Sequence, residues 1–463
     1  MREAAPPQPS PLAGGEAAGG GAASRPRLAY IMSRFPKISE TFVLYEILEL
    51  ERLGLQVEVF PLLRERQGVA HPEAATVVAR AHFHPFLSRK ILAAQLHFLL
   101  RRPLAYWRVL AEVLRGTWGS PNFVIGALGI FPKSVRFALE MRALGVDHVH
   151  AHFATHPAVA ALVVHRLSGI PFSFTAHGSD LHVDRRMLAH KVQAAAFAVS
   201  ISAYNKEVMV RECGEAARDK IHIVHCGVDP AVFAPPARRG GARENGAPEA
   251  AAASATEPET LRLLCVASLE AVKGHRTLIE ACDLLRQRGV RFRCDLIGDG
   301  PERDAVVAQI AAAGLGAQVC WHGLLPRPEV SRMLAAADIF CLPSVPTPQG
   351  KKEGIPVVLM EAMASGLPVV SSRLSGIPEL VEDGVSGVLV EPRDSVALAD
   401  AIQALGEDAA RRLRLGQAGR EQVGQHFDLR TNAQRLAALF AQGGTARRAA
   451  PSSAREAVSS GSV

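Results

Sequence analysis

The chain has 463 residues, of which 48% are hydrophobic and 21% charged, and this composition excludes a disorder-dominated or fibrous protein. Its length predicts two domains of roughly 150 to 200 residues each. The net charge of +7 suits nucleic acid, an anionic membrane surface or phosphorylated ligands equally well, but no RNA-binding, zinc-finger or helix-turn-helix pattern accompanies it, so we expect no nucleic acid partner.

Cysteine usage and the amino-terminal segment bear on the compartment. The seven cysteines are scattered and never spaced Cys-x-x-Cys, which argues against a disulfide framework or a zinc-thiolate site and favours the cytoplasm. Residues 1–25 are rich in Pro, Gly and Ala and lack the basic and apolar regions of a signal peptide, so we expect a disordered tail. Since no run of ~20 uninterrupted apolar residues occurs, membrane contact is expected to be peripheral, on the cytoplasmic face.

The first half of the chain alternates short β-rich runs with helical patterns, as a parallel sheet requires. A strand at 27–32, a helix at 40–53 and a strand at 56–62 form a β-α-β beginning. We interpret residues 26–235 as one Rossmann-like domain, whose further strands are predicted at 147–153, 172–176, 198–202 and 221–224.

Residues 88–118 carry six basic side chains against a single acid, Glu112, and include Trp107 and Trp118. Basic residues interleaved with leucine and aromatic residues are typical of helices that lie at a membrane interface. The same pattern fits the solvated basic face of ordinary surface helices. An anionic membrane surface is therefore one possible partner of this segment.

A second β/α series follows a segment with almost no large apolar side chain, residues 236–259, which we interpret as a linker or insertion. The series predicts a second Rossmann-like domain over 260–425. A helix at 426–443 is expected to pack back toward the first domain, and 444–463 is expected to be a disordered tail. The second domain's predicted strands are 262–266, 292–297, 319–322 and 339–342, and its predicted helices are 275–287, 302–313 and 327–336.

Two carboxylates eight residues apart, Glu353 and Glu361, carry the strongest chemical signal. Pro356 stands between them where helices start, after a strand and a Pro/Gly/Lys-rich loop. Helix N–H groups at the carboxyl edge of an α/β sheet bind phosphate oxygens, so a diphosphate fits between the two acids. The alternative is an acid favoured by the helix dipole and a second acid on the helix surface.

The stretch from Lys352 to Val370, with Gly376-Ile-Pro-Glu-Leu-Val and Gly387 after it, closely resembles glycosyltransferase family four, and the similarity extends from about residue 28 to about residue 440. It looks most like the bacterial exopolysaccharide and colanic acid branch. The resemblance implies an α/β protein of the GT-B fold, in which two doubly wound Rossmann-like domains face a cleft. It also implies that a sugar is transferred from a nucleotide diphosphate donor with retention of configuration.

Further motifs follow in the order that the family has them. Thr-Ala-His-Gly-Ser-Asp at 175–180 is similar to the family's His-Gly-x-Asp, which implies that His177 contacts the donor sugar. The stretch 265–275 is similar to Gly-Arg-Leu…Lys-Gly, which implies that Lys273 binds the diphosphate. Ser268 stands where the family has an arginine. We expect one of three other cations to replace it, namely Lys351, Lys352 or Arg373.

The resemblance assigns the remaining donor contacts as well. Glu353 is expected at the sugar and Glu361 at the ribose. The Gly-Asp-Gly turn at 298–300 lacks the third glycine of a dinucleotide fingerprint and is expected beside the nucleotide. The other implied positions are Gly298, Asp299, Gly300, Leu324, Gly354 and Ile355 for the donor, and Ser39 and Thr41 for phosphate or acceptor.

Three histidines on one face of a predicted strand, His148, His150 and His152, raise the alternative of a metal site. A flat strand spaces such side chains about 7 Å apart and leaves a fourth ligand to come from elsewhere. No Asp-x-Asp occurs in the sequence. We therefore expect neither a metal nor a cofactor, and expect helix N–H groups and Lys273 to neutralise the leaving diphosphate.

The combined prediction is a retaining, metal-independent hexosyltransferase of exopolysaccharide or cell-surface polysaccharide biosynthesis. The donor is expected mainly on the second domain, and a glycan or lipid-linked acceptor mainly on the first. Two alternatives stay open. One is a sugar-nucleotide epimerase of the same fold, and the other is a non-catalytic nucleotide-sugar-binding subunit of a glycan assembly complex.

Overall fold

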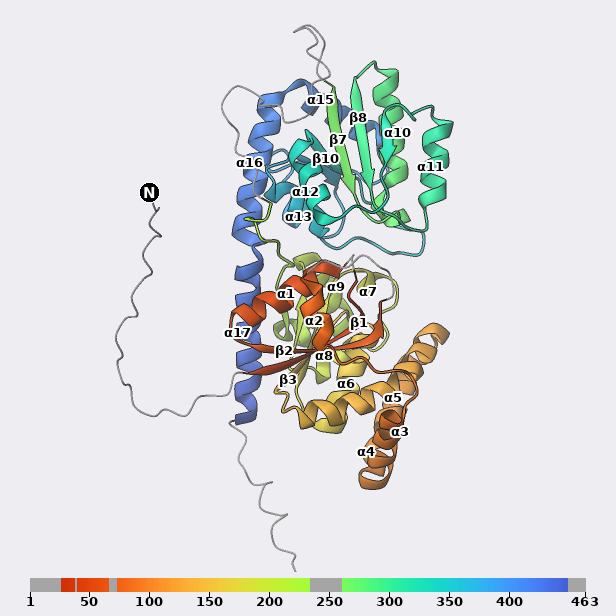
Figure 1. The fold of residues 1–463 in the computed structure, drawn as a ribbon, viewed down its shortest axis with the longest axis vertical. Helices are drawn as coiled ribbons and strands as arrows, with labels where there is room; N and C mark the ends of the chain where they lie inside the picture. Colours follow the sequence, from red (N-terminus) through yellow and green to blue (C-terminus); the bar gives the residue numbers. More distant parts are fainter. Residues whose placement is uncertain (1–25, 38–39, 66–72, 234–259, 449–463) are drawn as a thin grey trace, which may run out of the picture.

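The computed structural model describes residues 26–37, 40–65, 73–233 and 260–448. Within them, two six-stranded sheets form two lobes stacked along the long axis of the molecule (Figure 1). We call residues 26–233 together with the last helix the first lobe, and residues 260–426 the second lobe. The predicted tail at 1–25, the predicted linker at 236–259 and Ser39 lie outside the described residues.

The first sheet has the strand order β2-β1-β3-β4-β5-β6, and every pair is parallel. Helices cover both of its faces, so its strands are largely buried, and all five residues of β3, His-Val-His-Ala-His, are inaccessible. Its strands are β1 (Arg27–Phe35), β2 (Gln56–Arg64), β3 (His148–His152), β4 (Phe172–Ala176), β5 (Phe197–Ser200) and β6 (Ile221–Ile223).

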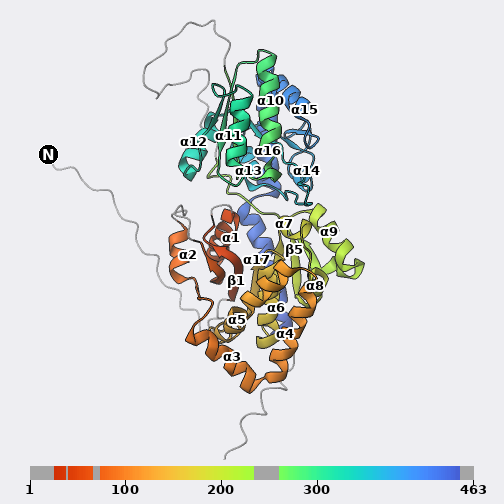
Figure 2. The same cartoon turned by 90° about the vertical axis from the view of Figure 1, so that its right-hand side faces the viewer.

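The helices of the first lobe include a group, α3 to α5, at the end of the molecule away from the second sheet (Figures 1 and 2). Ser88 caps α3 by accepting a hydrogen bond from Ile91 N, and Pro103 and Pro121 start α4 and α5. The helices are α1 (Thr41–Arg52), α2 (Ala74–Arg80), α3 (Arg89–Arg101), α4 (Pro103–Thr117), α5 (Pro121–Ala143), α6 (His156–Ser168), α7 (Ser179–His182), α8 (Leu188–Ala194) and α9 (Ala203–Cys213).

Helix α5 is the one helix among the described residues that is long and apolar enough to cross a membrane by length and composition. This helix is not an uninterrupted apolar run in the sequence, because it contains Lys133 and Arg136. In the fold α5 packs against α3, α4 and α6 and buries ten of its residues, among them Phe131 and Phe137. These contacts are those of a core helix.

The second sheet has the order β12-β11-β10-β7-β8-β9 and is also parallel throughout. Both sheets are doubly wound, as predicted. The strands are β7 (Leu261–Val266), β8 (Phe292–Ile297), β9 (Val319–Trp321), β10 (Ile339–Leu342), β11 (Val369–Ser372) and β12 (Val388–Val390). The helices are α10 (His275–Gln287), α11 (Arg303–Ala312), α12 (Arg327–Ala336), α13 (Val357–Ala364), α14 (Ile377–Leu380), α15 (Ser395–Glu407) and α16 (Ala409–His426).

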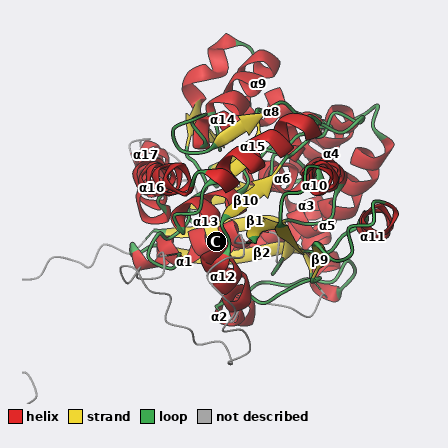
Figure 3. Ribbon diagram, turned by 90° about the horizontal axis from the view of Figure 1, so that it is seen from above, coloured by secondary structure: helices red, strands yellow, loops and turns green. Residues whose placement is uncertain are grey.

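The last two helices connect the lobes, and Figure 3 shows them nearly end-on at one side of the molecule. Helix α16 packs on α13 of the second lobe, whereas α17 (Leu429–Arg448) packs on α1 and β3 of the first lobe. The chain crosses between the lobes twice at one place, where Val228 N donates to Phe427 O and Leu429 N donates to Val228 O, both at 3.0 Å. Helix α17 continues five residues past the predicted boundary at 443.

Candidate active site

The loops that follow β7 and β10 bring together the two residues expected to handle donor charge. Lys273 Nζ lies 2.5 Å from Glu353 Oε2, and each side chain is only 17% exposed. The next residue, Gly274, has φ +74°, and a β-carbon on it would lie 1.8 Å from Pro343 O. Only glycine permits this approach, so the Lys273 loop is seated directly on the end of β10.

The first lobe meets this pair through the loop after β4. A β-carbon on Gly354 would lie 2.4 Å from His177 O, and one on Gly178 would lie 3.1 Å from Gly354 N. The two loops therefore touch backbone to backbone. His177, predicted at the sugar, and Glu353 lie on the two sides of this contact.

Asp180 holds the His177 loop in shape. Its carboxylate accepts hydrogen bonds from Ala154 N at 2.7 Å, His177 N at 3.0 Å and Gly178 N at 2.7 Å. Burial raises the pKa of Asp180, and these backbone N–H groups oppose that shift. The acid of the His-Gly-x-Asp motif is thus an internal cap of the loop.

Glu361 lies on α13, whose first turn follows Pro356. Burial raises the pKa of Glu361 to about 7, and the positive charge of Arg327 opposes the shift. Arg327 itself is held at the lobe boundary, because its guanidinium lies 4.6 Å from the centre of the Tyr45 ring and 5.2 Å from that of Phe233.

The nucleotide-side loops pack on one another through main-chain contacts. A β-carbon on Gly298 would lie 1.9 Å from Ala267 O, and one on Gly300 would lie 2.6 Å from Leu269 O. Gly298 N donates to Gly323 O at 2.8 Å. The Gly-Asp-Gly turn is therefore pressed against the loop that contains Ser268 and is bonded to the loop that contains Leu324, which is 51% exposed.

Comparisons with known proteins match each lobe to a glycosyltransferase family model. The family model for glycosyl transferases group 1 matches residues 248–422, and that for glycosyltransferase family 4 matches residues 108–232. The amylovoran biosynthesis glycosyltransferase AmsK of Erwinia amylovora is 30% identical over 89% of this chain and 99% of its own length. WcaL of Escherichia coli K12, assigned to colanic acid biosynthesis, is 31% identical over the same shares.

The chain belongs to glycosyltransferase family four. A solved structure of HepE from Anabaena in complex with UDP superimposes with a TM-score of 0.63 at 18% identity, covering 90% of this chain and all of that one. This likeness shows that the transferase has the GT-B fold, as the sequence predicted.

Among the cations expected to replace the family's arginine, Lys351 lies nearest to the Ser268 loop. Its Nζ pairs with Glu270, whose other carboxylate oxygen lies 3.4 Å from Ser268 Oγ. Lys352 instead donates to Tyr204 OH at 3.2 Å. Arg373 pairs with Asp383 at 2.7 Å and with Glu391 at 3.5 Å. Of the three cations, Lys351 thus contacts this loop through Glu270, and its role at the diphosphate stays a prediction.

The remaining predicted positions lie around this centre. Ile355 is buried, and its Cγ1 would lie 2.8 Å from a β-carbon placed on Gly376. Thr41 is the first residue of α1, and its predicted neighbour Ser39 lies outside the described residues. Their contacts with donor, phosphate or acceptor stay predictions.

Sequence reasoning missed the roles of two groups of residues in this transferase. Glu379 crosses between the lobes and caps α9, accepting from Ala203 N at 2.7 Å and Tyr204 N at 2.8 Å. Glu46 of α1 and His152 of β3 form a hydrogen-bonded chain to His177. These roles are not visible in the sequence, because the bonded residues lie far apart in it. The separations are 176 and 175 residues for the two bonds of Glu379, 106 for Glu46–His152 and 25 for His152–His177.

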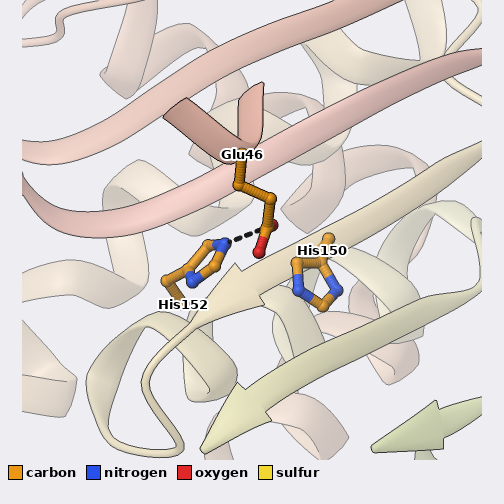
Figure 4. Close-up of side chains that lie close together, drawn as sticks. All are labelled: Glu46, His150 and His152. Atoms are coloured by element: carbon orange, nitrogen blue, oxygen red, sulfur yellow. Dashed lines mark hydrogen bonds and ion pairs between the residues drawn. The ribbon is translucent and has the colours of Figure 1, made fainter. Parts of the chain in front are cut away.

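The three histidines considered as metal ligands form hydrogen bonds with other side chains. His148 and His150 share Ser173 Oγ at 2.7 and 2.8 Å, and the other nitrogen of His150 lies 2.9 Å from Thr175 Oγ1. A different set, Glu46, His150 and His152, has one ligand atom each within 4.8 Å of the others (Figure 4). A second such set among the described residues is Asp295, Cys320 and His322. Metal independence stays a prediction.

Proposed function

We propose that this transferase moves a hexose-type sugar from a nucleotide diphosphate donor to a glycan or lipid-linked acceptor, with retention and without a metal, in exopolysaccharide or cell-surface polysaccharide biosynthesis on the cytoplasmic side of the membrane. The observation that carries the proposal is the Lys273–Glu353 pair seated against the His177 loop. AmsK and WcaL support the pathway class, and HepE, solved with UDP, supports a nucleotide-containing donor.

The paired state of Lys273 and Glu353 suggests how the donor enters. The ammonium and the carboxylate neutralise each other, and each side chain is only 17% exposed. A donor diphosphate takes over Lys273, which frees Glu353 to accept hydrogen bonds from sugar hydroxyls. One binding event thus exchanges an internal ion pair for two contacts to the donor.

The chemical step needs no protein nucleophile in this proposal. The bond from the anomeric carbon to the diphosphate breaks, and the acceptor oxygen bonds to that carbon from the same face. The acceptor proton passes to the departing phosphate oxygen. Lys273 and the N–H groups at the start of α13 stabilise the leaving charge, and contact between the lobes excludes water that would hydrolyse the sugar.

Acceptor-dependent release of nucleoside diphosphate tests this function. Release only when acceptor is present supports it. Sugar-nucleotide isomerisation without acceptor would indicate an epimerase, and binding without turnover would indicate a non-catalytic subunit. Lys273→Ala should lower kcat/KM by about 10³-fold, because it removes a preorganised charge from the leaving group. Product with inverted configuration, or activity abolished by EDTA and restored by a divalent metal, would contradict the proposed mechanism.

Helices α3 and α4 also favour docking to an anionic membrane, consistent with a lipid-linked acceptor. Their apolar side chains stand in solvent, with Leu100 71% exposed, Leu104 79% and Trp107 58%. Leu92, Leu96 and Leu100 follow at four-residue spacing along one side of α3. The exposed cations around them complement anionic headgroups: Arg89, Lys90, Arg101, Arg102, Arg108 and Arg115.

Co-sedimentation with vesicles of phosphatidylcholine, with and without phosphatidylglycerol, tests this surface. We expect binding to the anionic vesicles, and its loss when Arg101, Arg102 and Arg108 are changed to Glu. The matched control reverses Arg276, Arg286 and Arg303, three exposed cations on α10 and α11 of the second lobe. Unchanged sedimentation of the first triple variant would contradict the docking surface.

A further inference from the structure

The described part of the first lobe contains a buried chain of hydrogen bonds that ends at His177. Tyr30 OH lies 2.7 Å from Glu46 Oε1, and the same oxygen lies 3.1 Å from His152 Nε2. His152 Nδ1 lies 3.1 Å from His177 Nε2. Figure 4 shows Glu46 reaching from α1 to the imidazole of His152 on β3. The chain thus runs from β1 and α1 through β3 to the loop after β4.

For an ionised Glu46 and a neutral His152, the chemistry of the groups sets the direction of each bond. An ionised carboxylate only accepts hydrogen bonds, so Tyr30 OH and His152 Nε2 both donate to Glu46. With His152 neutral, its Nδ1 is left as an acceptor, and His177 Nε2 must donate to it. Nδ1 of His177 then carries the lone pair. Its neighbour there is the half-buried Cys226, whose Sγ at 3.9 Å is a weak donor.

The packing around His177 holds the ring in this orientation. Phe42 and Phe153 lie against it, with ring centres 4.8 and 4.6 Å away. Phe153 adopts φ +75°, unusual for a residue with a bulky side chain. Burial, and the nearby His152, hold the pKa of His177 well below its usual range, so this ring is neutral at physiological pH.

We infer that Glu46 and His152 are positioning residues of the transferase, which set the tautomer of His177 so that its Nδ1 lone pair accepts a hydrogen bond from a hydroxyl of the donor sugar or acceptor. The inference rests on the proposed function for the identity of that hydroxyl. The arrangement is analogous to a carboxylate that selects the tautomer of a catalytic imidazole. Here the selection passes through a second imidazole.

The neighbouring His150 is not part of this chain. Both of its nitrogens are taken, by Ser173 and Thr175. A metal on Glu46, His150 and His152 would take one nitrogen from each imidazole, so it would have to replace one hydrogen bond of His150 and one of His152. Hydrogen bonds to other side chains thus account for every ring nitrogen of His150 and His152.

Imidazole ¹⁵N chemical shifts in the protein without ligands test the tautomer directly, with the His177 signals assigned by their loss in His177→Ala. We expect a protonated Nε2 and an unprotonated Nδ1 on His177. Protonation of both nitrogens of His152, or the opposite tautomer of His177, would overturn the inference. This readout needs no turnover, so it remains decisive even if the chain transfers no sugar.

Kinetics of Glu46→Gln test whether the tautomer matters. We expect kcat to fall roughly 10- to 100-fold, the range for a lost partner behind a functional imidazole, with the donor KM little changed. The matched control is Glu49→Gln, which removes another buried carboxylate from the same helix, paired with Arg52 at 3.0 Å. Equal activity of the two variants, with an unchanged His177 spectrum, would overturn the inference.

A second variant guards against misfolding. His152→Phe keeps a ring in the core but removes both nitrogens. Because Glu46 acts through His152, a variant that carries both Glu46→Gln and His152→Phe should have the same kcat as His152→Phe alone. If the two residues acted independently, their separate losses in kcat would multiply. Stoichiometric zinc in the purified protein that is absent from both Glu46→Gln and His152→Phe would identify a metal site and overturn the inference.

Discussion

The second lobe brings its loops to the site through glycines, whereas the first lobe brings His177 there through buried polar side chains. Gly274, Gly298 and Gly300 each stand where a β-carbon would strike a carbonyl oxygen of the neighbouring loop. On the other side, Asp180 and His152 hold the His177 loop through hydrogen bonds. Replacing these glycines should therefore disrupt the second lobe's loops by steric clash, whereas replacing Asp180 or His152 should disrupt the His177 loop by removing hydrogen bonds.

Of the variants that test this difference, Gly354→Ala should lower kcat/KM most, because at Gly354 a glycine of the second lobe packs against the His177 loop of the first. The new methyl group would lie 2.4 Å from His177 O and 2.9 Å from Ile201 Cδ1. A displacement of about 1 Å between the loops should lower kcat/KM by about 10²-fold. Steady-state kinetics with thermal unfolding checks this, since the variant should remain folded.

The control for that substitution is Gly424→Ala. Gly424 lies in α16 with no atom within 4 Å of an added β-carbon, so activity should be unchanged. Wild-type activity of Gly354→Ala would show that the lobes do not need this close approach.

The pH dependence of donor binding should give the next effect, through Glu361. Its pKa of about 7 lies above the usual value, so the folded protein binds a proton at Glu361 more tightly than the unfolded chain does. This proton binding stabilises the fold at low pH, and the stabilisation is lost as pH rises from about 4.5 through 7. A ribose diol donates to the ionised form. Donor affinity should therefore rise roughly tenfold from pH 6 to pH 8.

Calorimetric titration in buffers of different ionisation enthalpy measures this directly. Donor binding near pH 7 should release a proton, and Glu361→Gln should bind with an affinity that does not vary with pH over the same range. Proton uptake by the unmodified protein would reverse the assigned role.

Some strands could be predicted from the sequence and others could not, for a physical reason. Predicted strands such as 172–176, 292–297 and 339–342 match β4, β8 and β10, because buried parallel strands form continuous apolar runs between turn residues. Strands β11 and β12 were missed. Only two of the four residues of β11 are apolar and β12 has three residues in all, so neither forms an apolar run long enough to indicate a buried strand.

The contacts of the candidate site divide in the same way. The Gly-Asp-Gly turn and Lys273-Gly274 are local in sequence, so their pattern could be recognised. The role of Glu46 depends on α1 crossing β3, and that of Arg327 on the seating of one lobe against the other. Such contacts are set by tertiary packing, which no spacing in the sequence records.

Glu379→Gln should give the smallest effect. This carboxylate spans the lobes and satisfies two free N–H groups at the start of α9, so it combines a helix cap with a charge at the positive end of the helix dipole. Glutamine keeps an accepting oxygen but loses the charge and one of the two bonds. We expect about 1 kcal/mol of lost stability, measured by denaturant unfolding. Glu382→Gln, an exposed acid nearby, is the control, and an equal loss there would show that the cap does not bind the lobes together.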